Sequence, residues 1–386
     1  MSKPNKIAIL AGDGSAPEFM AAAVRVLKHA AQKFKLQLEF EEALVGGAAY
    51  DRYGHPLPPE TLKITDASDA ILFGSVGRDD LPQGLVEKEG LLAIRKHYGF
   101  FANLRPATVY ASLSQASSLK EERLKDERGN AGFEILTVRE LTGGAYFGDR
   151  VRMEDTGGEY ASDNMKYTRK EIERILKVGF EAARKRKKVL HSVDKANVLD
   201  SSKLWRSIAQ AMAKDYPDVA LKHLYVDNAA MQIATWPRQF DVIVTENLFG
   251  DILSDLSAAI TGSLGLLPSA SINEKGFGMY EPSGGTAPDL AGLGIVNPIA
   301  QIRSAAMLLS YSFKLEKESQ ALENAVEKAI EKGARTIDLA GSKEVYEKTR
   351  APIANRDKDA VLKILKAHQI LTTEGMADRI IEELNR

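Results

Sequence analysis

The chain has 386 residues, of which 44% are apolar and 27% charged, as expected for a globular protein of one large or two smaller domains. Its formal net charge of −1 gives no electrostatic basis for binding nucleic acid or an anionic membrane. Cysteine is absent, which excludes disulfides, thiolate zinc sites and a cysteine nucleophile, and suits a cytoplasmic location.

Two further exclusions follow from composition. No apolar run approaches the ~18 residues of a membrane span, and the polar segment 1–6 lacks the apolar core of a secretory signal. The six histidines do not fall at metal-binding spacings, so any metal would be held by carboxylates. Oxygen ligands of this kind select Mg²⁺ or Mn²⁺.

Strands and helices alternate along the first two thirds of the chain, a pattern that predicts an α/β protein. In chain order we expect a strand over 6–11, a helix over 17–34, strands over 36–44 and 70–74, a helix over 91–98 that Pro106 ends, a strand over 133–138, a helix over 167–186, a strand over 189–193, a helix over 203–216, and strands over 220–226 and 240–245. The Gly12-Asp13-Gly14 turn matches neither GxGxxG nor a P-loop. Helices are predicted over 298–313 and 316–333, and the remainder from 342 is charged and helical.

The segment Asn247–Asp255 (NLFGDILSD) follows a buried strand and continues with apolar residues at helical spacing. Asp251 and Asp255 therefore stand at i and i+4 on one helix face, just past the carboxyl end of a strand, where open α/β sheets bind ligands. One interpretation makes Asp251 a first-turn acid stabilised by the helix dipole and Asp255 a solvated residue. The other places a divalent cation between them, which cancels their repulsion.

Three arginines stand near predicted element ends: Arg95, Arg105 and Arg139. A guanidinium can bind a carboxylate through two parallel hydrogen bonds, so three arginines beside an acid pair suggest a dicarboxylate held next to a metal. Each arginine alone is equally compatible with a surface ion pair.

Three other polar residues have two readings each. Lys195 directly follows a strand, where a lowered pKa would make it a base, although a solvated turn lysine fits the pattern too. Tyr146, in a glycine-rich turn, suits a general acid or an aromatic plug. Asp227, at another strand end, is a possible third oxygen donor to a metal.

Five segments resemble the isocitrate/isopropylmalate dehydrogenase family of metal-dependent, β-decarboxylating dehydrogenases: RELTGGAYFG at 139–148, DKANVL at 194–199, YVD at 225–227, NLFGDILSD at 247–255 and GGTAPD at 284–289. The resemblance runs in order from residue 7 to about 338, and the RELTGG form points to the 3-isopropylmalate dehydrogenase branch. It implies an α/β fold of two domains rather than a GxGxxG Rossmann fold. The first domain would be discontinuous, 1–101 plus 252–386, and carry NAD; the second, 102–251, would hold substrate and metal and form the dimer, with an arm at about 150–166.

The resemblance also implies NAD-dependent oxidative decarboxylation of 3-isopropylmalate to 4-methyl-2-oxopentanoate, a step of leucine biosynthesis, in a homodimer. The three arginines would bind the substrate carboxylates. Asp251 and Asp255, with the partner subunit's Asp227, would hold Mg²⁺ or Mn²⁺, and Asp227 would also contact the substrate. Lys195, also from the partner, would take the hydroxyl proton, and Tyr146 would later protonate the enol carbon.

For the cofactor, the resemblance implies two loops in place of a GxGxxG turn. The residues are Gly74, Ser75, Val76 and Gly77 in the first loop and Gly285, Thr286, Ala287, Pro288, Asp289 and Asn297 in the second. Asp289 would accept the adenosine-ribose hydroxyls and repel a 2′-phosphate, so NAD is expected over NADP. A helix N-cap role for Asp289 is compatible with this. Many family members have His where Gly284 stands.

Two other departures from the family pattern bear on function. The pocket for the isopropyl group usually has a Glu three residues before a Leu-Leu pair, here Leu91 and Leu92, but that position is Lys88. Glu87 and Glu89 flank it, so either a local shift restores the acid or the substrate preference differs. About twenty extra charged residues also stand between 338 and 373, and we assign them only a surface helix.

Three alternative functions remain open from the residues. The nearest is a sister dehydrogenase acting on another 3-substituted malate, such as homoisocitrate or tartrate. A metal-dependent hydrolase would use the acid pair but need neither NAD nor Asp289 and Tyr146. A non-catalytic ligand-binding protein would tolerate Lys195→Ala.

Overall fold

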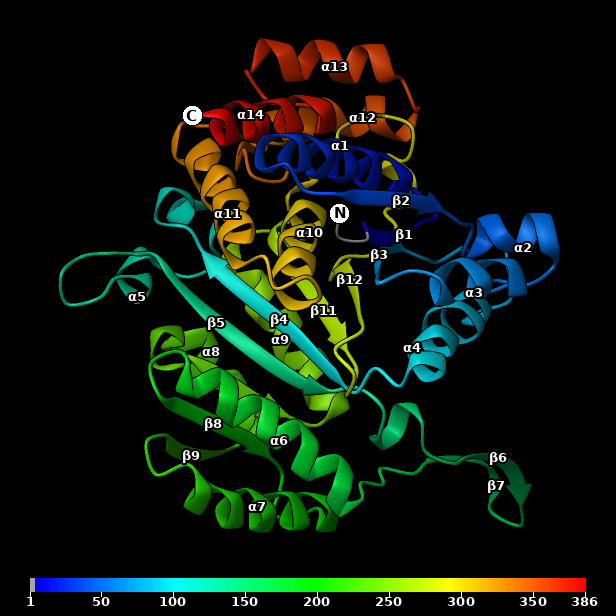
Figure 1. The fold of residues 1–386 in the computed structure, drawn as a ribbon, viewed down its shortest axis with the longest axis vertical. Coiled ribbons are helices and arrows are strands. Elements are labelled where there is room, and N and C mark those ends of the chain that lie inside the picture. The colour runs from blue at the N-terminus through cyan, green and yellow to red at the C-terminus, as the bar shows by residue number, and fades with distance from the viewer. Residues whose placement is uncertain (1–3) are drawn as a thin grey trace.

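The computed structural model describes residues 4–386, which form one large mixed sheet covered by helices on both faces (Figure 1). The strand order is β2-β1-β3-β12-β11-β4-β5-β10-β8-β9. Their bounds are β1 (Asn5–Gly12), β2 (Leu38–Glu42), β3 (Ala70–Ser75), β4 (Ala102–Val109), β5 (Phe133–Glu140), β8 (Val189–Asp194), β9 (Ala220–Tyr225), β10 (Val242–Thr245), β11 (Pro268–Ile272) and β12 (Gly278–Pro282).

The sheet is parallel in its two outer parts and antiparallel in the middle. β2, β1, β3 and β12 run parallel, as do β5, β10, β8 and β9. β4 pairs antiparallel with both β5 and β11, and β11 with β12. In Figure 1, β4 and β5 cross the centre of the molecule between an upper and a lower group of elements. The predicted α/β fold class is therefore confirmed.

The helices are α1 (Ala16–Phe34), α2 (Gly47–Tyr53), α3 (Pro59–Asp66), α4 (Ala93–Tyr98), α5 (Glu121–Leu124), α6 (Arg169–Arg184), α7 (Asp200–Met212), α8 (Val226–Thr235), α9 (Asn247–Thr261), α10 (Ile299–Tyr311), α11 (Glu316–Glu331), α12 (Lys343–Ala354), α13 (Lys358–Ala367) and α14 (Thr373–Asn385). The longer helices lie where the hydrophobic pattern predicts them, whereas the short helices α2 and α5 were not expected. None of the helices within 4–386 is long and apolar enough to cross a membrane.

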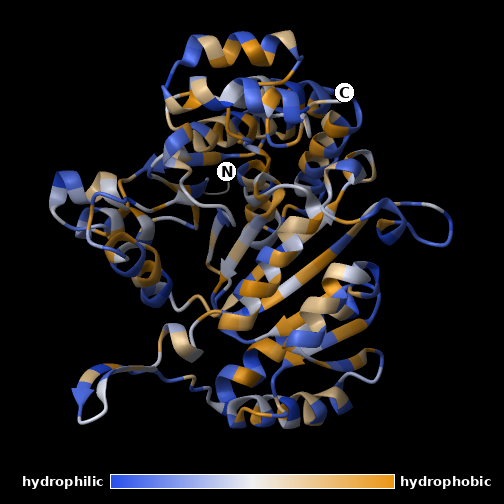
Figure 2. Cartoon of the chain, turned by 180° about the vertical axis from the view of Figure 1, so that it is seen from behind, coloured by the Kyte–Doolittle hydropathy of each residue, from blue (hydrophilic) through white to orange (hydrophobic). Residues whose placement is uncertain are grey.

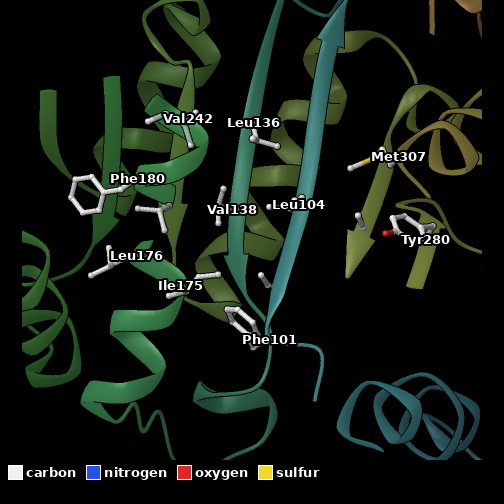
Figure 3. Close-up of a cluster of buried hydrophobic side chains, with 14 of the residues drawn as sticks. Phe101, Leu104, Leu136, Val138, Ile175, Leu176, Phe180, Val242, Tyr280 and Met307 are labelled. Carbon is white, nitrogen blue, oxygen red and sulfur yellow. The ribbon is translucent and has the colours of Figure 1, made fainter. Parts of the chain in front are cut away.

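A continuous apolar core joins the central strands to the helices on one face (Figure 3). Leu136 and Val138 of β5 and Val242 of β10 are buried, and they meet Leu176 and Phe180 of α6. All four residues of β10 are buried, which is why its sequence is an unbroken apolar run rather than an alternating one. This core fixes the carboxyl ends of β5 and β10, from which the candidate site is built.

Two sequence expectations about element ends were wrong. The helix that carries Arg95 ends at Gly99, whose φ of +63° gives the left-handed cap that glycine favours, whereas Pro106 lies inside β4. The helix that carries the acid pair begins at Asn247 with Glu246 as its N-cap, so Asp251 is not in its first turn. The helix dipole therefore contributes less to Asp251 than predicted, because its effect is confined to the first turn.

The polar segment after Tyr146 forms an isolated hairpin of β6 (Arg150–Asp155) and β7 (Gly158–Asp163). Every residue of both strands is exposed. Figure 1 shows the hairpin projecting away from the body of the molecule, and Figure 2 shows it as largely hydrophilic. It lies within the segment 150–166 predicted as an arm.

Candidate functional site

The start of α9 is fixed by buried hydrogen bonds at its N-terminus. Glu246 accepts from the backbone N–H of Leu248 at 3.1 Å and of Phe249 at 2.6 Å, and the Tyr167 hydroxyl donates to it at 2.6 Å. Burial raises the pKa of Glu246 above its usual range. These contacts set where the helix begins and hence the direction in which Asp251 points.

Gly250 allows the helix to approach an arginine. A Cβ on Gly250 would lie 2.6 Å from Cγ of Arg139, which crosses the helix at this point. Arg139 Nε and Nη2 donate to Asn247 Oδ1 at 2.9 and 2.7 Å, and Nη1 donates to Asp251. A larger residue at 250 would displace the guanidinium from both partners.

Asp251 is the centre of the candidate site. Its Oδ2 accepts from the Tyr146 hydroxyl at 2.6 Å, and its Oδ1 is contacted by Arg139 and by Arg105 Nη1 at 3.3 Å. Burial alone would raise its pKa, but Arg139 and Arg105 outweigh that effect and the pKa is lowered. Asp251 therefore remains a carboxylate well below neutral pH.

Asp255 lies one turn further along the same face of α9. Its Oδ1 is 3.4 Å from Arg105 Nη1, which also donates to Ser254 at 2.8 Å. Arg105 is held by Asn103, whose Oδ1 accepts from its Nε at 2.7 Å. Burial raises the pKa of Asp255, and the neighbouring charge of Asp251 adds to that rise. The two acids are thus near each other, as predicted, but differ in how easily they protonate.

The pKa values of Arg139 and Tyr146 are also shifted by their surroundings. Burial and the charge of Arg105 lower the pKa of Arg139 to about 10. Burial and the hydrogen bond to Asp251 raise the pKa of Tyr146, so its hydroxyl keeps its proton. The site is thus a compact group of positive charge with one firmly ionised acid and one proton donor. Such a group suits an anionic ligand with more than one carboxylate.

Arg95 takes a different partner from the other two arginines. Its Nη2 donates to Glu281 Oε1 at 2.6 Å, and both side chains are buried, at 7% exposure each. It is close enough to the site for its charge to lower the pKa values of both Arg139 and Asp251. The structure therefore brings Arg95 into the electrostatic neighbourhood of Asp251 without direct contact.

Lys195 and Asp227 form a separate pair. The ammonium is 2.5 Å from Asp227 Oδ1, and Asp227 is 66% exposed, at the start of α8. The hydrogen bond from Lys195 lowers the pKa of Asp227. No group of three or more His, Cys, Asp or Glu residues suited to a metal occurs among residues 4–386. Within one chain, Asp227 does not join Asp251 and Asp255.

The two loops predicted for the cofactor meet. The Ser75 hydroxyl donates to the carbonyl of Gly284, and Ser15 donates to the carbonyl of Thr286, each at 2.8 Å. Asp13 accepts from the backbone N–H of Gly77 at 3.0 Å and so ties the first loop to β1. Gly285 has open space around it, because a Cβ there would meet nothing within 4 Å.

A pocket of about 280 Å³ lies beside the second loop. Its lining includes Gly285, Ala287 and Asn297 of the predicted set, but not Asp289. Asp289 lies in a short 3-10 turn, Pro288–Leu290, and is exposed, so it is not a helix N-cap. The concave, mostly apolar lining with a few polar groups is typical of a site for a planar organic ligand.

The segment before Arg95 contains a π-helical turn, Glu87–Leu92. A π turn accommodates one residue more than an α turn, so it absorbs a single extra residue at this point. The side chains of Glu87, Lys88 and Glu89 point in different directions. Glu87 Oε1 lies 3.3 Å from the position a Cβ would take on Gly77, whereas Lys88 lies beside Gly84 and Glu89 beside His55. Glu87, not Lys88, faces the first cofactor loop.

The family comparison agrees with this geometry. The model for the family described as isocitrate/isopropylmalate dehydrogenase matches residues 6–353. The chain belongs to the isocitrate/isopropylmalate dehydrogenase family. It is 51% identical to a 3-isopropylmalate dehydrogenase of Syntrophotalea carbinolica over 100% of this chain and 99% of the relative. It is 54% identical to one of Campylobacter jejuni over 87% of this chain and 93% of the relative.

Solved structures of an isocitrate dehydrogenase and of a beta-decarboxylating dehydrogenase match the fold. An isocitrate dehydrogenase of Methylococcus capsulatus has a TM-score of 0.80 at 30% identity, covering 99% of this chain and all of that one. A beta-decarboxylating dehydrogenase of Thermococcus kodakarensis has a TM-score of 0.74 at 31% identity, covering 99% and 96%. The protein is therefore an oxidoreductase, and its family implies a nucleotide cofactor and a divalent metal.

Sequence reasoning missed several residues of this isocitrate/isopropylmalate dehydrogenase site. Asp13 looked like part of a tight turn, yet it binds the backbone of both Gly47 and Gly77. Glu281, the partner of Arg95, carried no motif of its own. Asp338 accepts from Ser263 at 2.5 Å and from Asn297 at 2.9 Å at the rim of the pocket. No motif in the sequence marked Asp338, because the recurrence of DLAG at 289–292 and 338–341 is short enough for chance to explain.

Proposed function

We propose that this enzyme catalyses NAD-dependent oxidative decarboxylation of 3-isopropylmalate to 4-methyl-2-oxopentanoate, CO₂ and NADH. The observation that carries the proposal is the cluster in which Asp251 contacts Tyr146, Arg139 and Arg105. A hydrolase has no use for a proton-donating tyrosine beside two carboxylate-binding arginines. The identity of 51–54% to 3-isopropylmalate dehydrogenases supports the choice of substrate.

The chemistry of the donors fits a hard divalent cation, Mg²⁺ or Mn²⁺. Asp251 and Asp255 offer carboxylate oxygens on one helix face, and Asp227 of the partner subunit would complete the set. When bound, the cation polarises the substrate hydroxyl and its neighbouring carboxylate and stabilises negative charge that develops after CO₂ loss. Arg105 and Arg139 already hold Asp251 in its ionised form, which is the form that binds a cation.

The residues of the chain then have these roles. Arg95, Arg105 and Arg139 bind and orient the two carboxylates of the substrate. The partner subunit's Lys195, as the neutral amine, would accept the proton of the C2 hydroxyl, and NAD⁺, when bound, would be the acceptor of the C2 hydride. The C3–carboxylate bond would break next, releasing CO₂ and leaving its electron pair in the C2=C3 double bond of an enolate. Tyr146 donates its proton to C3, for which its raised pKa keeps it ready.

NAD is proposed to lie along the loops Gly74–Gly77 and Gly285–Asn297, with its adenosine in the pocket of about 280 Å³. The nicotinamide half of NAD would lie against the first loop, which contains Gly74, Ser75, Val76 and Gly77. Thr286, Pro288 and the exposed Asp289 would meet the ribose, where a carboxylate disfavours NADP. The proposed cofactor domain consists of residues 1–101 together with residues 252–386. The proposed substrate and dimer domain consists of residues 102–251.

A homodimer is proposed because one chain lacks a complete ligand set. Helices α8 and α9 pack against each other. On these two helices, Met231 and Ile252 are nevertheless 59% and 55% exposed. Pairing of these faces with their copies would bury both residues and bring the Lys195–Asp227 pair near the neighbouring Asp251. The β6–β7 arm is the second proposed contact between subunits.

A sister dehydrogenase for another 3-substituted malate is the second candidate, and the side chains of the π turn bear on the choice between the two. Glu87 faces the first cofactor loop, and Leu91 packs against the same apolar cluster as Val76 of that loop. Leu91 and Leu92 are the proposed apolar wall of the substrate pocket. This arrangement supports a branched aliphatic group on C3 rather than a polar one. The test is NADH formation from NAD⁺ and Mg²⁺ with 3-isopropylmalate, isocitrate, homoisocitrate and tartrate in parallel. We expect the highest kcat/KM for 3-isopropylmalate, and NADP⁺ should support little activity. Absence of NADH formation with every substrate would exclude the proposal.

A further inference from the structure

The extra segment near the C-terminus forms two helices, α12 and α13, which we call the C-terminal hairpin (Lys343–Ala367). Figure 1 shows it at one end of the molecule, beside α14 and α1. Sequence analysis assigned it only a surface position because of its charge. Figure 2 shows apolar residues interleaved with polar ones along its outermost helix, so it has an apolar side that needs a partner.

That partner is the second cofactor loop, residues 284–297. Val361 and Leu365 of α13 are 0% and 1% exposed and belong to one apolar cluster with Leu293 and Ile295 of the loop. Leu290, which lines the proposed adenosine pocket, packs against the same cluster. The hairpin thus covers the outer side of the loop whose inner side faces the pocket.

A polar contact accompanies the apolar one. Arg356, in the turn between α12 and α13, donates through Nη2 to the carbonyl of Ala291 at 2.7 Å. On the opposite side of the loop, Glu18 of α1 accepts from the backbone N–H of Gly292 and, at 2.7 Å, of Gly294. The backbone from 291 to 294 is therefore held between the hairpin and α1.

The loop has little structure of its own. Its only regular element is the short turn Pro288–Leu290, and Ala287, Gly292 and Gly294 all have positive φ values of 41°, 82° and 71°. A left-handed alanine is strained, and glycine in these positions gives the chain many other conformations when it is released. The observed conformation is therefore imposed by contacts from outside the loop.

We propose that the C-terminal hairpin is a brace that holds loop 284–297 in its nucleotide-binding conformation and thereby sets the affinity for the dinucleotide, with Arg356 as its positioning residue. This inference rests on the proposed function, since it takes the nucleotide to be NAD. When the binding conformation is only partly populated, the apparent Kd rises in inverse proportion to that fraction. The substrate arginines and Tyr146 lie outside the loop and keep their geometry.

The test compares Arg356→Ala with Arg356→Lys, Leu365→Ala and the control Lys363→Ala, an exposed position on the same hairpin. NADH affinity is measured by fluorescence titration, steady-state kinetics give KM and kcat, and hydrogen–deuterium exchange of the cofactor-free protein reports on the loop. We expect Arg356→Ala to raise the Kd for NADH and the KM for NAD⁺ by about three- to tenfold, as loss of one exposed charge-assisted hydrogen bond allows.

The expected pattern is specific. The kcat at saturating NAD⁺ and the KM for 3-isopropylmalate should stay within about twofold of wild type, Arg356→Lys should recover part of the affinity, and Lys363→Ala should change nothing. Amides of 284–297 should exchange faster in Arg356→Ala and Leu365→Ala, whereas those of β5 and β10 should not. Unchanged Kd and unchanged exchange would overturn the brace, and so would equal losses toward NAD⁺ and substrate. If the wild-type protein does not bind NADH, the proposed function fails, while the exchange measurement still tests the brace.

Discussion

The Tyr146 hydroxyl donates a hydrogen bond to Asp251 Oδ2 over 2.6 Å, from a glycine-rich turn to a helix more than a hundred residues later in the chain. The contact joins the proposed proton donor to the proposed metal ligand. It raises the pKa of Tyr146 and helps to keep Asp251 ionised, so each residue favours the protonation state that the other requires.

Tyr146→Phe should lower kcat by about 10²- to 10⁴-fold, the range for loss of a positioned general acid. The aromatic ring remains over Arg139, so the melting temperature should change little. Steady-state NADH formation and thermal unfolding of the same preparations check both statements. A kcat within a factor of ten of wild type would remove Tyr146 from the proton transfer.

Metal affinity should depend on pH through Asp255. Burial raises its pKa, so this carboxylate takes up a proton at a higher pH than an ordinary aspartate does, and protonation removes a metal ligand. Mn²⁺ affinity should therefore be full above that raised pKa and decline as the pH falls through it. Asp255→Asn should bind Mn²⁺ weakly, with much less dependence on pH. Titration of Mn²⁺ by calorimetry at several pH values measures this, and an unchanged pH profile in Asp255→Asn would contradict it.

Subunit sharing predicts complementation between two inactive variants. Tyr146→Phe and Lys195→Ala homodimers should both be nearly inactive. After random exchange of subunits, half of the dimers are mixed, and each mixed dimer has one intact site if Lys195 acts across the two-fold axis. Activity should then return to about a quarter of wild type. If Lys195 acts within its own chain, mixing restores nothing, and a wild-type mixture treated in the same way serves as control.

The π turn predicts which acid influences the substrate. Glu87→Ala should lower kcat/KM for 3-isopropylmalate by about tenfold, because Glu87 faces the first cofactor loop. Lys88→Ala, one residue along, should have little effect because its side chain lies beside Gly84. Deletion of Lys88 from the otherwise wild-type chain should convert the π turn to an α turn and leave activity close to wild type. Equal effects of the two alanine substitutions would show that neither residue has a specific role.

The buried Arg95–Glu281 pair predicts a stability effect. Glu281→Gln leaves the guanidinium buried opposite a neutral amide, which should lower the free energy of unfolding by about 3 kcal/mol. Glu344→Gln removes an exposed pair with Lys348 and should produce no measurable change. Chemical denaturation of the three proteins makes the comparison. Similar midpoints for both variants would mean that the buried pair is not important for folding.

The sequence predicted the architecture of the site where motif and local period coincide. The helix of Asp251 and Asp255 follows a buried strand as expected, and the two cofactor loops do meet. The segment after Tyr146 forms an exposed hairpin within the range 150–166 that was expected to be an arm. The helix and the hairpin depend on residues close together in the chain, so pattern and spacing identify them, whereas the two loops are distant in the chain and only the family resemblance implied that they act together.

Other features depend on residues distant in the chain, and sequence patterns did not predict them. Arg95 and Glu281 are 186 positions apart, and neither one indicates the other. The sequence showed Lys88 where the family usually has Glu, but whether the backbone would shift there through a π turn depends on packing around Leu91. The charge of the C-terminal hairpin concealed the few apolar residues, Val361 and Leu365 among them, that fix it to the loop.

The fifteen residues of α9 meet three structural requirements. The helix presents Asp251 to the arginines, needs a glycine at 250 for Arg139, and exposes Ile252 on its far side. Few substitutions can satisfy all three, so we expect laboratory evolution of new substrate ranges to leave this helix unchanged. Adaptive changes should accumulate instead in the π turn at 87–92, where insertion or deletion of a residue reorients a side chain without disturbing the acid pair.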